Sequence, residues 1–210
     1  MNKYLLNAKI QYMFYVLTHP IDGFYEVRHR ERGSALLAII TVILFSISYT
    51  INRMCASFIV NDINPRTVDL LSDMQGVIVI FFLFCIGNWS ITCLMNGEGR
   101  FKDIVTVVGY ALLPMVLTYI PATILSLAVS DEEIIFYNII IWLGTAWAVI
   151  LAVIGIMTVH NYTSGKTAIT LILTIVAMLI IMFVLMMLYT LLQQVYGFLY
   201  SLYTELKFRT

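Results

Sequence analysis

The chain has 210 residues, of which 61% are hydrophobic and 11% are charged, and its mean hydropathy is +0.92. Soluble domains average about 45–50% apolar and about 25% charged residues, so this composition indicates an integral membrane protein. Twelve Lys and Arg residues balance twelve Asp and Glu residues. No strongly basic balance points to nucleic acid, and we expect no nucleic-acid partner.

Residues 1–33 form a basic head that precedes the first long apolar run. Its basic residues are Lys3, Lys9, Arg28, Arg30 and Arg32. Apolar residues recur at helical spacing at Leu6, Ile10, Met13, Phe14 and Leu17. This pattern predicts an amphipathic helix that lies in the membrane interface or packs against the other helices. Pro20 ends it, and a second short element is expected to turn Ile21, Phe24 and Val27 inward.

Five uncharged runs follow the head, and each reaches the roughly 20 apolar residues that a membrane-spanning helix needs. We predict an all-α membrane domain over residues 34–210. Its five transmembrane helices are expected at about 34–52, 75–96, 104–129, 134–159 and 168–192. The last uncharged run, residues 167–204, would form a helix of about 57 Å. Because this exceeds the bilayer core, its C-terminal tail must project, lie in the interface or turn back.

Loop charges predict the orientation. The head and the loops after the second and fourth helices hold eight of the twelve basic residues. The loop after the third helix contains Asp131, Glu132 and Glu133 and no basic residue. By the positive-inside rule the N-terminus is cytoplasmic, and five crossings then place the C-terminus on the far side.

The sequence gives no sign of catalysis. An ionisable side chain inside a transmembrane helix marks a proton or ion pathway, and the five predicted spans contain none. Gly165-Lys166-Thr167 resembles the end of a phosphate-binding loop, but His160 stands where that loop requires glycine. The three histidines lack metal-ligand spacing. We therefore expect no enzymatic activity, no catalytic residue, no cofactor and no metal.

Small and polar residues inside the predicted spans are the candidates for close packing or for an interior polar site. Gly144, Ala148 and Ala152 recur every four residues, which allows a neighbouring helix to approach closely. Asn88 needs a polar partner in the dry interior and can join two helices.

The third predicted span carries Pro114 and Pro121, seven residues apart and so on nearly one face. Proline removes a backbone donor and kinks a helix, and Pro114 frees the carbonyl of Tyr110. In lipid that carbonyl needs a new partner, for which Asn88 or Thr106 is expected. Such kinks line substrate sites in some transporters, whereas in a plain bundle they only shape the packing.

Three segments, in order, resemble the Yip (Ypt-interacting protein) domain family, and in particular its bacterial-type members. They are Thr18-His19-Pro20 with Phe24 and the basic stretch to Gly33-Ser34, the link Leu94–Asp103 with Phe101, and Gly109-Tyr110 leading to Pro114. The resemblance implies five helices, a cytoplasmic N-terminus and no catalysis. Eukaryotic members bind Rab-type GTPases and partner Yip proteins in vesicle transport. They do so with a long cytosolic N-terminal domain, and this chain has only 33 residues before its first span.

The resemblance thus implies a multi-pass protein of a prokaryotic plasma membrane, where some members are accessory to ABC-type transport systems. Our leading hypothesis is a non-enzymatic integral membrane scaffold or accessory subunit. Its partners are expected to be the lipid bilayer and other membrane proteins, in hetero- or homo-oligomers. The alternative is a small-molecule transporter or channel component, with a path past Asn88, Tyr110 and Pro114.

Overall fold

The computed structural model describes residues 3–30, 32–61 and 63–209, with the backbone alone for residues 3–6, 206 and 209. Every regular element in these ranges is a helix, so the expected all-α class is confirmed. Five helical segments are long and apolar enough to cross a membrane, which confirms the predicted number.

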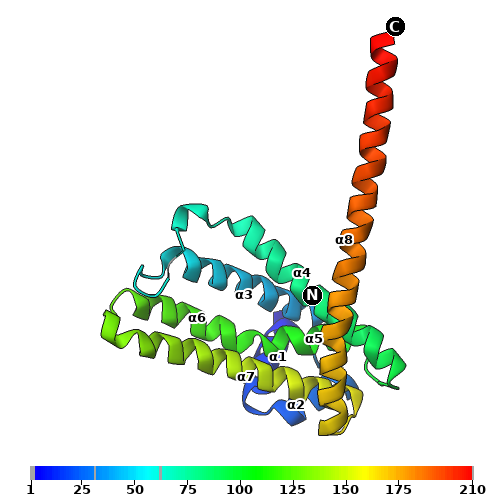
Figure 1. Cartoon of the computed structure of the whole chain (residues 1–210). Coiled ribbons are helices and arrows are strands. Elements are labelled where there is room, and N and C mark those ends of the chain that lie inside the picture. Colours follow the sequence, from blue (N-terminus) through cyan, green and yellow to red (C-terminus); the bar gives the residue numbers. More distant parts are fainter. Residues whose placement is uncertain (1–2, 31, 62, 210) are drawn as a thin grey trace.

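The helices follow one another through short connections (Figure 1). In chain order they are α1 (Lys3–Thr18), α2 (Pro20–His29), α3 (Ala35–Cys55), α4 (Leu70–Leu94), α5 (Phe101–Ala111), α6 (Leu113–Ser126), α7 (Ile134–His160) and α8 (Ser164–Arg209). Short 3-10 turns occur at Pro65–Thr67 and Asp131–Glu133. The α4–α5 and α7–α8 connections lie at one end of the helices, and the α3–α4 and α6–α7 connections lie at the other.

The head folds into a helical hairpin of α1 and α2 that packs against α5 and α7. Tyr12, Val16, Phe24 and Val27 are buried in the main apolar core. Ile21, which was expected to face inward, is instead 61% exposed. The reason is geometric: residues three apart drift by about 60° around a helix, so a three-residue repeat does not hold one face.

Two helices extend beyond the uncharged runs. Asp69 caps α4, because its carboxylate accepts hydrogen bonds from the backbone N–H groups of Leu71 (3.2 Å) and Ser72 (3.3 Å). Helix α4 therefore includes Asp73, and α3 continues far enough to include Arg53. These two residues form an ion pair. The ends of two candidate spans thus contain charged groups that the uncharged runs had excluded.

The third span is broken between α5 and α6. Helix α5 ends at Ala111, and Pro114 lies in the first turn of α6, where a missing N–H costs nothing. The expectation that Asn88 or Thr106 would take up the Tyr110 carbonyl is wrong. The Asn88 amide donates to Thr174 instead, and the Thr106 hydroxyl donates to the carbonyl of Lys102. At the break itself the N–H of Leu112 donates to the carbonyl of Gly109 (3.3 Å).

Helix α8 has 46 residues, which corresponds to about 69 Å. Its first turns pack against α4, and Thr167, Thr170 and Thr174 are fully buried there. The helix does not turn back: it continues without a break, and its C-terminal half extends beyond the rest of the molecule in Figure 1.

We expect Gly109→Val to destabilise the protein by about 1–3 kcal/mol, because overpacking forces packed elements apart. A Cβ at Gly109 would lie 2.5 Å from the Cβ and 2.8 Å from the Cα of Ala38, so α3 would have to move away from α5. The measurement is the temperature at which half of the purified protein loses monodispersity in detergent. Gly76→Ala in α4 is the control, since no atom lies within 4 Å of that Cβ position. Equal midpoints for both variants would contradict the packing argument.

Candidate functional site

Polar contacts join three segments that are distant in sequence at the end of the molecule where the head packs. The guanidinium of Arg28 donates to the backbone carbonyl of Val159 (2.7 Å) and to the carboxylate of Glu98 (2.5 Å). The N–H of Gly99 donates to Nδ1 of His160 (3.2 Å). We call these five residues the head clamp, because they fasten α2 to the α4–α5 loop and to the end of α7.

The loops reach the clamp because two asparagines end their helices in the left-handed conformation. Asn96 (φ 54°) follows α4, and Asn161 (φ 53°) follows α7. In each case the next residue's N–H returns to a carbonyl of the last turn, at 2.7 Å and 3.0 Å. Glycine is needed where the loops meet, since a Cβ at Gly97 or Gly99 would lie 2.7 Å or 2.8 Å from the ring of His160.

Arg28 stabilises this end of the protein in two ways. Its charge lies at the C-terminus of α7, where the helix dipole favours a cation. It also lowers the pKa of the Glu98 carboxyl below its ordinary value, through a hydrogen bond and charge attraction. A lowered folded-state pKa means that this contribution is present at neutral pH and is lost as the pH falls through the lowered value. Glu98 is exposed, so solvent screens the pair and the carbonyl contact matters more.

The His160 ring is fixed by its neighbours. Because Nδ1 accepts from Gly99, the neutral ring carries its proton on Nε2, which is buried without a partner. The ring stacks on Tyr162, with centroids 5.3 Å apart. Tyr162 in turn donates to the carbonyl of Met95 (3.2 Å) and lies under the Lys166 ammonium, 4.1 Å from its ring centroid. These contacts hold the α7–α8 loop against the end of α4.

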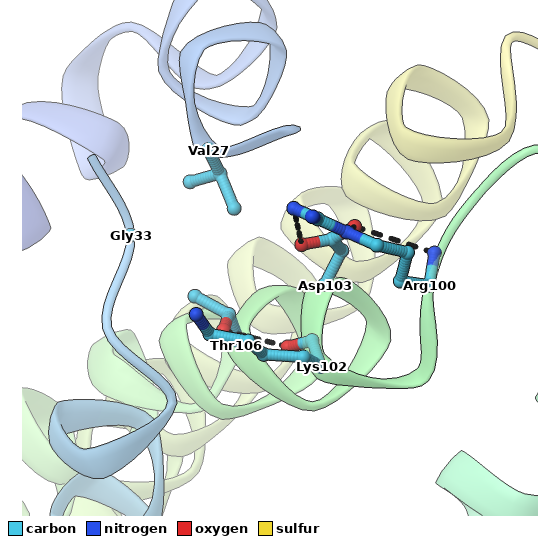
Figure 2. Close-up of a pocket in the computed structure, with 6 residues that line it drawn as sticks. All are labelled: Val27, Gly33, Arg100, Lys102, Asp103 and Thr106. Atoms are coloured by element: carbon cyan, nitrogen blue, oxygen red, sulfur yellow. Dashed lines mark hydrogen bonds and ion pairs between the residues drawn. The ribbon is translucent and has the colours of Figure 1, made fainter. Parts of the chain in front are cut away.

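Figure 2 shows a small cavity between the end of the head and the start of α5. It is lined by Val27, Gly33, Arg100, Lys102, Asp103 and Thr106. Its volume of about 10 Å³ has room for a single water molecule and none for a cofactor. The Asp103 carboxylate accepts from Nε (3.0 Å) and from the backbone N–H (3.3 Å) of Arg100. This arrangement caps α5 and leaves the carboxylate paired.

The remaining basic residues of the head are less closely held. Arg30 and Arg32 both pair with Glu26, at 3.1 Å and 2.8 Å, and both side chains are more than half exposed. Lys9 is half-buried, and the side chain of Lys3 lies outside the described residues.

Asn88, Tyr110 and Pro114, the residues of the alternative transport path, make separate contacts in the structure. The Tyr110 hydroxyl accepts a hydrogen bond from the backbone N–H of Ser34 (3.0 Å), which ties α5 to the start of α3. Its neighbour Gly109 packs directly on α3. Pro114 lines an open hollow of about 540 Å³ whose other lining residues are mainly apolar. Pro121 lies inside α6 and is exposed.

Asn88 lies between α4 and α8. Its side-chain amide donates to the hydroxyl of Thr174 (3.1 Å), and that hydroxyl donates to the carbonyl of Thr170 (2.8 Å). The Asn88 carbonyl oxygen is buried without a partner. Sequence reasoning missed the threonines, although Thr167, Thr170 and Thr174 recur at helical spacing and mark one face of α8.

Gly144 of α7 lies directly against α6. A Cβ at Gly144 would lie 2.1 Å from the Thr118 hydroxyl oxygen on α6. Ala148 is buried, and Ala152 is half-buried against the main core. Close approach of α6 to α7 thus depends on the absence of a side chain at Gly144.

A second polar cluster, at the opposite end, was not foreseen. The Asn52 amide donates to the hydroxyl of Thr123 (2.9 Å), and the Tyr137 hydroxyl donates to the Asn52 side-chain oxygen (2.9 Å). Together these bonds join α3, α6 and α7. Nearby, the ion pair between Arg53 and Asp73 joins α3 to α4. The only sequence signal was the position of these polar residues at the ends of the uncharged runs.

The fold and these contacts define an integral membrane protein whose interior polar groups connect helices. Within the described residues, no group of three or more His, Cys, Asp or Glu side chains could hold a metal ion. The family model of the Yip1 domain matches residues 14–188, and the chain belongs to this family. The resemblance to the Yip family is therefore confirmed. Comparison with curated proteins and with solved structures gives no match in either.

We expect Arg28→Met to loosen the head while preserving the apolar stem of the side chain. Hydrogen bonds to a charged group contribute about 1.5–3 kcal/mol, so amide exchange in α2 should rise by roughly tenfold to a hundredfold. Exchange in α6, which is remote from the clamp, should not change. Arg30→Met removes only the exposed pairing with Glu26 and is the control. If both variants exchange alike, the clamp does not hold the head.

Proposed function

We propose that this protein is a non-enzymatic membrane scaffold or accessory subunit that works by contact with other membrane proteins. The observation that carries the proposal is the pairing of interior polar side chains across helices. Asn88 bonds to Thr174, and Asn52 bonds to both Thr123 and Tyr137. Groups that bond to one another give the interior rigidity and leave few polar groups to bind a substrate.

The head clamp supports the same proposal. It fixes α2, the α4–α5 loop and the end of α7 as one surface at one end of the molecule. Arg30 and Arg32 remain more than half exposed on it. A preorganised surface loses little entropy on binding, which suits a docking platform. We expect its partner to be a protein of membrane organisation or trafficking, or a component of an ABC-type transport system.

The orientation we propose places this platform in the cytoplasm of a prokaryotic cell. The head, the α4–α5 loop and the α7–α8 loop carry most of the basic residues, and they meet at one end. The acidic turn Asp131–Glu133 lies at the opposite end. This separation of charge supports the positive-inside assignment.

A small-molecule transporter or channel component is the second candidate. The hollow of about 540 Å³ beside Pro114 favours it, since its size falls within the range of ligand pockets. Reconstituted vesicles distinguish the two functions. A flux that depends on the chain and disappears in Thr118→Leu, at a residue that lines this hollow, would establish transport, whereas a scaffold shows no flux in either form.

The orientation is tested with single cysteines in a chain that lacks Cys55, Cys85 and Cys93. A cysteine at Glu132 should react with a membrane-impermeant thiol reagent from outside intact cells. A cysteine at Lys102 should react only after the cells are opened, because its loop is cytoplasmic. The reverse labelling would invert the topology.

The scaffold function is tested by purification in mild detergent at native expression levels. We expect at least one other membrane protein to be enriched with the tagged chain relative to an untagged control. Arg28→Met should reduce the yield of that partner, because a loosened head adds an ordering cost to binding. Arg30→Met should retain it. A chain that purifies without any enriched membrane protein contradicts the proposal.

A further inference from the structure

A cavity of about 270 Å³ lies between α3 and α4, near the connection that joins them. This is the end of the molecule opposite the head clamp (Figure 1). The cavity is bordered by one face of each helix, and its lining includes Phe45, Tyr49 and Arg53 of α3 and Asp73, Gly76 and Ile80 of α4. Both helices are long and apolar enough to span a membrane, so the cavity lies where two candidate spans end.

The Arg53–Asp73 ion pair forms the polar part of this lining. Nε of Arg53 and the second carboxylate oxygen of Asp73 are buried, and neither has a hydrogen-bond partner within the described residues. The pair is not sealed off, because its side chains remain 27% and 11% exposed. Buried polar groups are costly to leave unpaired. A donor and an acceptor therefore remain for a molecule from outside the chain.

Both charged side chains are held in place before any ligand arrives. The guanidinium carbon of Arg53 lies over the Tyr49 ring, 5.7 Å from its centroid. The backbone carbonyl of Arg53 accepts a hydrogen bond from the side-chain amide of Asn61 (2.8 Å). Asp69 caps α4, which places Asp73 in the first turn of that helix. A preorganised site loses little entropy on binding.

The lining changes from polar to apolar toward the interior of the two spans. Phe45 precedes Arg53 by eight residues, or about 12 Å along α3. Ile80 follows Asp73 by seven residues, or about 10 Å along α4. A buried water needs two to four polar partners, and the side chains of Phe45 and Ile80 offer none, so water suits only the charged end. The cavity as a whole fits an amphiphile, with its headgroup at the ion pair and its chain directed into the bilayer.

We propose that this cavity binds a phospholipid whose zwitterionic headgroup carries a primary ammonium, as in phosphatidylethanolamine. The lipid phosphate accepts hydrogen bonds from the Arg53 guanidinium, whose planar fork suits phosphate. The ammonium donates to the Asp73 carboxylate. An acyl chain lies along Phe45 and Ile80, because lipid tails are as apolar as these side chains.

The two opposite charges select among headgroups. A headgroup with a net negative charge brings an anion toward Asp73 and gains only the contact with Arg53. A choline headgroup has no N–H with which to donate to the Asp73 carboxylate. The primary ammonium alone uses both members of the pair. The inference goes beyond the proposed function, because it rests on α3 and α4 and holds equally for a scaffold or a transporter.

The test is native mass spectrometry of the full chain in mild detergent, titrated with dioleoyl phosphatidylethanolamine, phosphatidylglycerol or phosphatidylcholine. We expect phosphatidylethanolamine to bind about tenfold more tightly than either of the other two, because charge-assisted hydrogen bonds form to both side chains.

Gly76→Leu fills the cavity and leaves the ion pair in place. No atom lies within 4 Å of the Cβ position of Gly76, so the new side chain enters open space, and leucine favours a helix more than glycine does. Binding of phosphatidylethanolamine should weaken by about tenfold. Gly165→Leu in α8 is the matched control, since its Cβ position is equally open and it lies at the other end of the molecule. It should bind like the unmodified chain.

A double variant tests the recognition of the headgroup. Arg53→Met combined with Asp73→Leu removes both charges together, so that no lone charge stays buried. This variant should bind the three lipids with equal affinity.

Four results would overturn the proposal. Equal affinity of the unmodified chain for the three lipids would indicate non-specific contact. A preference for phosphatidylglycerol would show that Arg53 alone recognises the phosphate. Unchanged binding in Gly76→Leu would place the lipid elsewhere, and the absence of any bound lipid would leave the cavity to water. None of these outcomes bears on the purification of other membrane proteins, so the two proposals fail separately.

Discussion

The hydrocarbon core of a membrane offers no hydrogen-bond partner, and this constraint governs the interior of the protein. Each buried polar group must find its partner within the chain or bear a cost of several kcal/mol. Threonine and serine hydroxyls meet the constraint locally, as when Thr41 donates to the carbonyl of Leu37 one turn earlier (2.9 Å). Side chains with more donors reach across helices, as Asn88 reaches Thr174. The polar residues of the spans therefore act as connectors, and this property underlies the scaffold that we propose.

The break in the third span obeys the same constraint. Proline is disfavoured in a helix interior because it leaves a carbonyl free, and Pro114 is buried within the third span. The chain resolves the conflict by ending α5 and starting α6, so that the proline occupies a first turn. The N–H of Leu112 closes the turn between the two helices by donating to the carbonyl of Gly109 (3.3 Å).

The sequence predicts the membrane-spanning helices of this structure but misses the side-chain contacts between them. The five spans and the family follow from composition and from local motifs, which one segment displays by itself. The partners of Arg28 and Asn88 do not, because one is a backbone carbonyl 131 residues away and the other is a threonine 86 residues away. Backbone acceptors carry no residue-specific signal, and the register between two spans depends on their packing. The full lengths of α3 and α4 were not predicted, because charged residues were taken to mark the ends of the helices. The Asp69 cap and the Arg53–Asp73 ion pair instead allow both helices to include charged residues.

Inside the bilayer the apolar surface of α8 needs no protein partner, since lipid tails are as apolar as leucine. Its one polar face is different, because Thr167, Thr170 and Thr174 are fully buried and Thr174 accepts a hydrogen bond from Asn88 of α4. An otherwise apolar helix therefore contacts the rest of the chain through its few polar residues. The same rule that pairs Asn52 with Thr123 and Tyr137 at one end of the bundle thus also fixes where α8 lies against α4.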